Sequence, residues 1–94
     1  MEWIRITAGE EVADFAQAKR LADAVAAERV EEPLLLSWFD RGRGVESPAG
    51  VSECHRGCDT PGYVDYAAAR GGALVVDIGQ GAYVFCYRPL GEFA

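Results

Sequence analysis

Two alternating apolar segments joined by a short glycine turn constrain the fold of this chain more than any other feature of its sequence. Residues 73–78 and 82–88 each alternate side chains with the period of two that a β-strand requires. Gly79-Gln80-Gly81 lies between them and supplies the positive φ angles of a tight turn. The pattern therefore predicts an antiparallel hairpin in which alternate residues share a face: Leu74, Val76 and Ile78 on one strand, and Tyr83, Phe85 and Tyr87 on the other.

The N-terminal third indicates a strand followed by a long helix. Residues 2–7 alternate in polarity, which is typical of a half-buried strand. Thr7-Ala8-Gly9-Glu10 fits a capping box, so the helix is expected to begin near Glu10 and to run to Val30, with Pro33 as the stop. Its apolar residues fall within one arc, as in a helix that packs on a sheet: Val12, Phe15, Ala18, Ala22, Val25 and Ala26.

The middle of the chain predicts one buried strand, a glycine-rich connection and a short helix. Residues 34–39 form a dense apolar run, which we interpret as a buried central strand. Residues 41–50 predict a loop or a wide hairpin, and residues 51–54 a short strand. Residues 63–70 predict a helix that Asp59 or Thr60 caps, with Pro61 at its entry and Gly71-Gly72 as its stop.

These segments together predict a single α+β domain over residues 1–94. Their order is β-α-β-(loop)-α-β-β. The expected architecture is a two-layer sandwich, with a mixed sheet of four or five strands and the long helix packed on one face. The pattern does not fix the order of the strands in the sheet.

Charge and hydropathy limit the partners of such a domain. The formal net charge is −6, so the chain lacks the basic surface of a nucleic-acid binder. The sequence shows neither a signal-peptide pattern nor the ~20 consecutive apolar residues of a membrane span. We therefore expect a cytoplasmic protein that engages neither nucleic acid nor a membrane, with its three cysteines reduced.

The densest group of reactive side chains lies in residues 53–59. As a zinc site it would use the two thiols and the imidazole, with a fourth ligand from Asp59 or Cys86, although the C-x3-C spacing is only weakly typical of zinc. As a thiol site it would use a cysteine whose pKa a neighbouring cation lowers, and which handles sulfur. As a structural segment it would need no ligand, and no cofactor is expected. The candidate residues are Cys54, His55, Cys58, Asp59 and Cys86.

Two arginines among glycines follow the central apolar strand. Arg41 and Arg43, joined by Arg56, form a candidate anion-binding set because guanidinium groups recognise anions with paired N–H donors. The alternative is a solvated turn, because no phosphate-loop pattern surrounds them. Both interpretations stay open at this point.

The aromatic residues outnumber what one face of a small sheet can hold. Ten of the 94 residues are Phe, Tyr or Trp, and some of them are expected on the face that the long helix leaves uncovered. Such a face can be a ligand pocket, a protein interface or a homodimer contact, or a core shared with the short helix. The leading interpretation is a non-catalytic binding or protein-interaction module, with self-association as one of its forms.

Several short motifs resemble a small prokaryotic family of uncharacterised domains. They are Ser37-Trp38-Phe39-Asp40-Arg41, Cys54-His55 with Cys58-Asp59, Pro61-Gly62-Tyr63-Val64-Asp65-Tyr66 and Arg70-Gly71-Gly72. The resemblance covers about residues 34–88. It implies a single small domain and brings no established activity, so it assigns no functional residue.

Overall fold

The computed structural model describes residues 1–7, 12–49 and 62–90, and within them the chain forms five strands and two helices. The strands are β1 (Glu2–Ile6), β2 (Pro33–Asp40), β3 (Val45–Ser47), β4 (Leu74–Ile78) and β5 (Tyr83–Pro89). The helices are α1 (Phe15–Arg29) and α2 (Gly62–Ala69). The expected α+β class and order of elements are confirmed.

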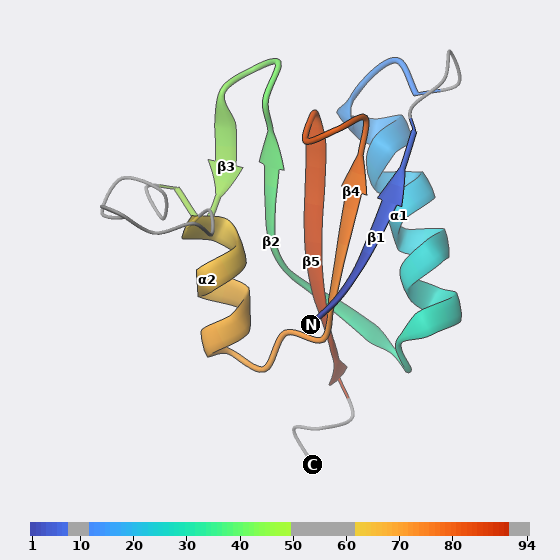
Figure 1. The fold of residues 1–94 in the computed structure, drawn as a ribbon, viewed down its shortest axis with the longest axis vertical. Coiled ribbons are helices and arrows are strands. Elements are labelled where there is room, and N and C mark those ends of the chain that lie inside the picture. Colours follow the sequence, from blue (N-terminus) through green and yellow to red (C-terminus); the bar gives the residue numbers. More distant parts are fainter. Residues whose placement is uncertain (8–11, 50–61, 91–94) are drawn as a thin grey trace.

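The strands form one mixed sheet in the order β1-β4-β5-β2-β3 (Figure 1). β1 and β4 run parallel, and the other neighbours are antiparallel. The hydrophobic strand β2 therefore lies beside the central strand rather than at the centre, which β5 occupies. β5 pairs with β2 on one side and with β4 on the other, because the predicted hairpin returns directly onto β4.

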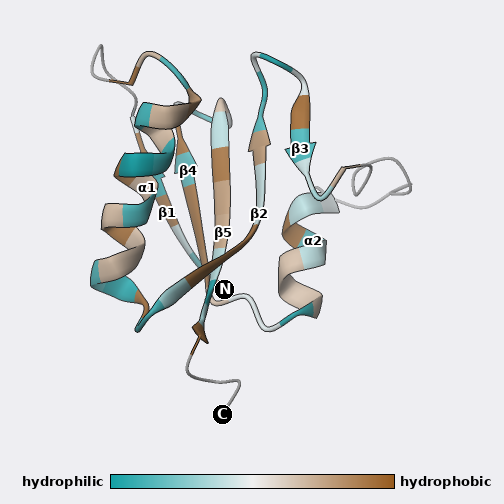
Figure 2. Cartoon of the chain, turned by 180° about the vertical axis from the view of Figure 1, so that it is seen from behind, coloured by the Kyte–Doolittle hydropathy of each residue, from teal (hydrophilic) through white to brown (hydrophobic). Residues whose placement is uncertain are grey.

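Helix α1 packs on one face of the sheet through its alanines. Ala18, Ala22 and Ala26 recur every four residues on one side of the helix and are fully buried. They pack against side chains that the hairpin pattern predicts to share a face, namely Leu74, Val76, Ile78, Phe85 and Tyr87. Figure 2 shows hydrophilic and hydrophobic bands alternating along α1, as this one-sided burial requires.

Helix α2 packs on the opposite face and adds a third layer to the two that the sequence predicts. Tyr63, Val64 and Ala67 pack against a buried cluster formed by Val75, Val84 and Cys86, whose positions alternate with those facing α1. In Figure 1 the two helices flank the sheet on opposite sides. Covering both faces explains why residues 34–39 are apolar without alternation.

The turn predicted at residues 79–81 is confirmed, whereas the segment predicted as a loop or a wide hairpin over residues 41–50 contains strand β3 after a short turn. Gly79, Gln80 and Gly81 have φ angles of 70°, 56° and 89°, and the carboxylate of Asp77 accepts a hydrogen bond of 2.6 Å from the Gly81 N–H. Residues 41–44 join β2 to β3 as a hairpin. The short strand predicted at residues 51–54 and the helix entry at residues 59–61 lie outside the described residues.

The start of the long helix is a correction. The helix begins at Phe15, not near Glu10, and its cap is Asp14, not Thr7. The Asp14 carboxylate accepts from the Gln17 N–H at 2.9 Å, while the Gln17 side chain accepts from the Ala13 N–H at 2.8 Å. These two reciprocal hydrogen bonds cap the helix as a capping box would, seven residues later than the sequence pattern predicts. Neither described helix is long and apolar enough to cross a membrane.

Candidate functional site

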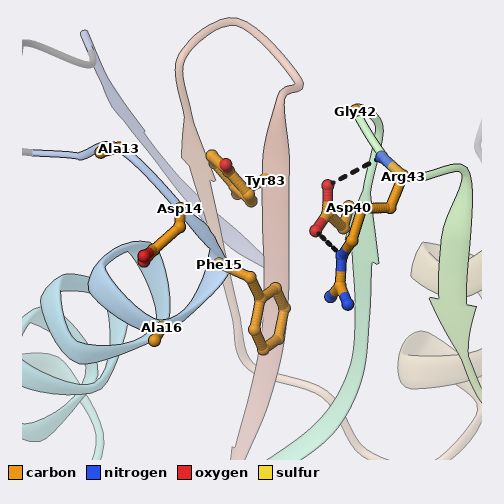
Figure 3. Close-up of a pocket in the computed structure, with 8 residues that line it drawn as sticks. All are labelled: Ala13, Asp14, Phe15, Ala16, Asp40, Gly42, Arg43 and Tyr83. Carbon is orange, nitrogen blue, oxygen red and sulfur yellow. Dashed lines mark hydrogen bonds and ion pairs between the residues drawn. The ribbon is translucent and has the colours of Figure 1, made fainter.

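An open hollow of about 500 Å³ lies between the start of α1 and the turn that follows β2 (Figure 3). The chain brings it together from three segments that are far apart in sequence. α1 and the residues before it form one wall, the end of β2 and its turn form the other, and the first residue of β5 lies between them. Its lining residues are Ala13, Asp14, Phe15, Ala16, Asp40, Gly42, Arg43 and Tyr83.

Asp40 is the buried polar residue of this hollow. It ends β2 with 3% of its surface exposed. One carboxylate oxygen accepts from the Arg43 backbone N–H at 3.3 Å, and the other accepts from the Arg43 Nε at 2.5 Å. Two charge-assisted bonds to one residue therefore compensate the burial of the carboxylate and hold the Arg43 side chain in one place.

The Arg43 guanidinium also lies over an aromatic ring. Its central carbon is 5.2 Å from the centroid of the Phe15 ring, a cation–π distance. The terminal nitrogens point away from Asp40 and lie beside Phe15 (Figure 3). The Arg43 side chain keeps 57% of its surface exposed, so its outer N–H groups are accessible to a ligand.

Phe15 is the centre of an aromatic cluster, of which Phe15 and Tyr83 form the floor of the hollow. Its ring centroid lies 4.6 Å from that of Trp38, 5.5 Å from Phe85 and 6.5 Å from Tyr83. The rings come from α1, β2 and β5 and are tilted against one another, as packed aromatic side chains prefer. The floor is therefore apolar, and it lies next to the Arg43 guanidinium that Asp40 holds.

The predicted arginine set does not act together in the described residues. Arg41 points to the β4–β5 turn, where its guanidinium donates to the Gln80 carbonyl at 3.1 Å. The Arg43 side chain instead contacts Asp40 and the Phe15 ring. Arg56 lies outside the described residues, so its place in the set stays a prediction.

Most of the predicted cysteine cluster also lies outside the described residues, namely Cys54, His55, Cys58 and Asp59. Cys86 is described and is fully buried in the cluster beneath α2. Burial raises the pKa of its thiol to about 11, although a hydrogen bond with Ser37 acts in the opposite direction. Among the described residues no three His, Cys, Asp or Glu side chains gather to hold a metal ion.

A second polar contact, partly buried, links the central strand to α1. The Tyr87 hydroxyl donates to an Asp23 carboxylate oxygen at 2.7 Å, and Lys19 Nζ donates to the other oxygen at 2.7 Å. Burial, followed by this bond to Asp23, raises the pKa of Tyr87 well above its usual value. The contact explains how α1 tolerates Lys19 and Asp23 on its half-buried side.

Sequence reasoning singled out Arg43 but missed Phe15 and Tyr83 as its neighbours. Both residues were assigned to packing faces, and nothing in their spacing indicates that they meet near the Asp40 turn. Asp40 itself carries a local signal. An acid at a strand end, three residues before an arginine in a glycine turn, favours a side chain that bonds back to the turn.

Comparison with known proteins extends the resemblance seen in the sequence. A family model for a domain of unknown function matches residues 1–87. The crystal structure of AF1514, described as a novel protein from Archeoglobus fulgidus DSM 4304, is similar over 95% of this chain and 94% of that chain, at 26% identity and a TM-score of 0.74. No curated protein matches the chain. The expectation of an uncharacterised family is thus confirmed, over nearly the whole chain.

Proposed function

The chain belongs to the DUF5619 family, a domain of unknown function, and we propose that it is a non-catalytic binding module for a small carboxylic acid with an apolar or aromatic body. The ligand would occupy the hollow between the start of α1 and the β2–β3 turn. The observation that carries the proposal is the Arg43 guanidinium, which a buried Asp40 fixes above the Phe15 ring.

The free N–H donors of Arg43 favour a carboxylate as the polar part of the ligand. Asp40 engages the Nε side of the guanidinium, so the terminal amino groups face away from Asp40 as paired donors. Paired guanidinium donors match the planar geometry of a carboxylate, with two parallel hydrogen bonds. Because Asp40 already holds the side chain, little conformational entropy is lost when the ligand binds.

The floor of the site favours an apolar body. Phe15 and Tyr83 present aromatic surface, and Ala13 and Ala16 leave room beside the helix start. Pockets for small ligands are generally lined by apolar and aromatic side chains, with a few polar groups that fix orientation. A ligand with a flat ring near Phe15 and a carboxylate on Arg43 would match both the apolar floor and the guanidinium donors.

The polar groups of the hollow support binding rather than catalysis. Asp40 is buried in its bonds to Arg43, and Asp14 is occupied as the helix cap. A general acid or base has to reach the reacting group of a substrate, and neither carboxylate is placed to do so. We accordingly propose no reaction at this site.

Amide chemical-shift mapping by NMR tests the proposal, with benzoate as the probe and benzamide as its neutral counterpart. Benzoate should shift the backbone amides of Phe15, Gly42, Arg43 and Tyr83 in a saturable manner, and benzamide should shift them far less. Arg43→Gln should abolish saturation at millimolar benzoate, and the matched control Arg41→Gln should retain it. Equal responses to benzoate and benzamide, or unchanged binding in Arg43→Gln, would refute the role of the guanidinium.

Two other expectations stay predictions. A thiol or metal site at Cys54, His55 and Cys58 lies in residues that the structure does not describe, and zinc analysis of the purified protein would test it. The cytoplasmic location also remains a prediction from the sequence.

A further inference from the structure

We infer that the chain forms a symmetric dimer by pairing the β1 strands of two copies, which would join their sheets into one. The inference does not depend on the ligand site, which lies at the other side of the sheet near β2. It rests on the edge of β1 that no other strand of the described residues covers, and on the order of side chains along that edge.

β1 ends the described sheet with unpaired backbone groups. The Glu2 N–H donates to the Ala73 carbonyl at 2.9 Å, and the Ile6 carbonyl accepts from the Gly79 N–H at 2.8 Å. The N–H and C=O of one residue point to the same side of a strand, and the side alternates along it. Those of Trp3 and Arg5 therefore point away from β4, toward the open edge.

The side chains on this edge complement a second copy of themselves. In an antiparallel pair centred on Ile4, Trp3 of each copy lies opposite Arg5 of the other, and each of these pairs exchanges two backbone hydrogen bonds. Within one chain the Arg5 guanidinium already lies 5.0 Å from the centre of the Trp3 ring. The same cation–π attraction operates across the pair, and the two Ile4 side chains meet on the opposite face.

Exposure and symmetry favour this edge over the other. Trp3 and Met1 are 38% and 44% exposed, which places two large apolar side chains at the start of β1. β3, the opposite edge, has three residues and is followed by Pro48, which lacks an N–H donor. Pairing of β1 with itself closes after two copies, whereas pairing of β1 with β3 is head-to-tail and would give a ring or an open filament.

The test combines solution mass with hydrogen exchange of the full chain. The mass should rise with concentration from 10.2 kDa toward twice that value, and the amides of Trp3 and Arg5 should become protected as it rises. A mass that stays at one chain up to millimolar concentration, or a dimer in which these two amides remain unprotected, would overturn the inference. The second result would assign the contact to another surface.

Two variants sharpen the test. Arg5→Pro removes an outward N–H that the β1–β4 ladder does not use, so it should leave a folded monomer. Arg5→Glu places an acid opposite the indole without altering the backbone, and it should weaken dimerisation at least tenfold even if the proline variant fails to fold. Arg20→Glu, on the exposed side of α1, is the control with the same change of charge and should dimerise normally. Benzoate mapping of the Arg5 variants should be unchanged, so the inference and the proposed function can fail separately.

Discussion

Asp40 and Arg43 give the hollow its chemistry at the scale of single residues. A carboxylate with 3% exposure requires bonded partners, and the glycine turn after β2 brings the backbone and side chain of Arg43 back to supply them. The same bonds orient the guanidinium over Phe15. The buried Asp40 carboxylate thus fixes the position of the exposed Arg43 guanidinium.

Removing Arg43 should therefore destabilise the fold through Asp40. Arg43→Ala leaves a buried carboxylate without its side-chain partner, at a cost of about 1–3 kcal/mol in the free energy of unfolding. Arg41→Ala, which loses only an exposed bond to a carbonyl, should change it by less than about 0.5 kcal/mol.

Urea unfolding of the single variants and of the Asp40→Asn/Arg43→Ala double variant measures this coupling. In the Asp40→Asn background, Arg43→Ala should have little further effect, because the buried charge is gone. Additive effects of the two substitutions would show that the residues do not depend on each other.

Cys86 makes stability depend on alkaline pH. Burial raises the pKa of the folded thiol to about 11, so the folded state keeps a proton that the unfolded state releases above about pH 9. The stabilisation is complete below that pH and is lost as the pH rises toward 11, with a limiting slope of about 1.4 kcal/mol per pH unit.

Unfolding free energies measured under reducing conditions between about pH 8 and pH 10 test this expectation. The Cys86→Ala variant should be less stable at neutral pH, because it leaves a cavity, but its stability should fall less steeply in this interval. Burial also raises the pKa of Tyr63, to about 12. Its effect on the free energy of unfolding begins only above about pH 10 and should be the same in both proteins. Equal slopes in the two proteins would contradict the assignment.

Secondary-structure elements are where sequence and structure can be compared most directly. Period-two alternation identified β1, β4 and β5, and the alanine arc identified the buried side of α1, because both patterns record which face is covered. The start of α1 could not be identified in this way. Thr7-x-x-Glu10 and Asp14-x-x-Gln17 both offer a side-chain acceptor and a polar residue three positions later. Only the packed position of Ala18, Ala22 and Ala26 against the sheet selects the second.

The cap of α1 can be tested with two single substitutions. Asp14→Ala removes the acceptor for the Gln17 N–H and should lower the free energy of unfolding by about 1 kcal/mol. Thr7→Ala, at the position that the sequence pattern favours, should change it by less than about 0.5 kcal/mol. Thermal or urea unfolding gives both values, and a larger effect at Thr7 than at Asp14 would contradict the described helix start.

The described part of the molecule is a sheet covered by α1 on one face and by α2 on part of the other. This arrangement leaves the two places where we propose that the chain meets partners, the hollow at the Asp40 turn and the outer edge of β1. The sequence pointed to the first through Arg43 and the turn that begins at Asp40. Phe15 and Tyr83 join them through the packing of α1 and the order of the strands, which no local pattern specifies. The residues of the cysteine cluster apart from Cys86 contribute nothing to this comparison, because they lie outside the described part of the chain.

The most direct measurement of the central claim is a crystal structure of the chain grown with 4-bromobenzoate, in which the anomalous signal of bromine locates the ligand. We expect the carboxylate on the terminal nitrogens of Arg43 and the ring beside Phe15 and Tyr83, with Asp40 still bonded to the Nε of Arg43. A ligand bound elsewhere, or a carboxylate directed away from Arg43, would contradict it.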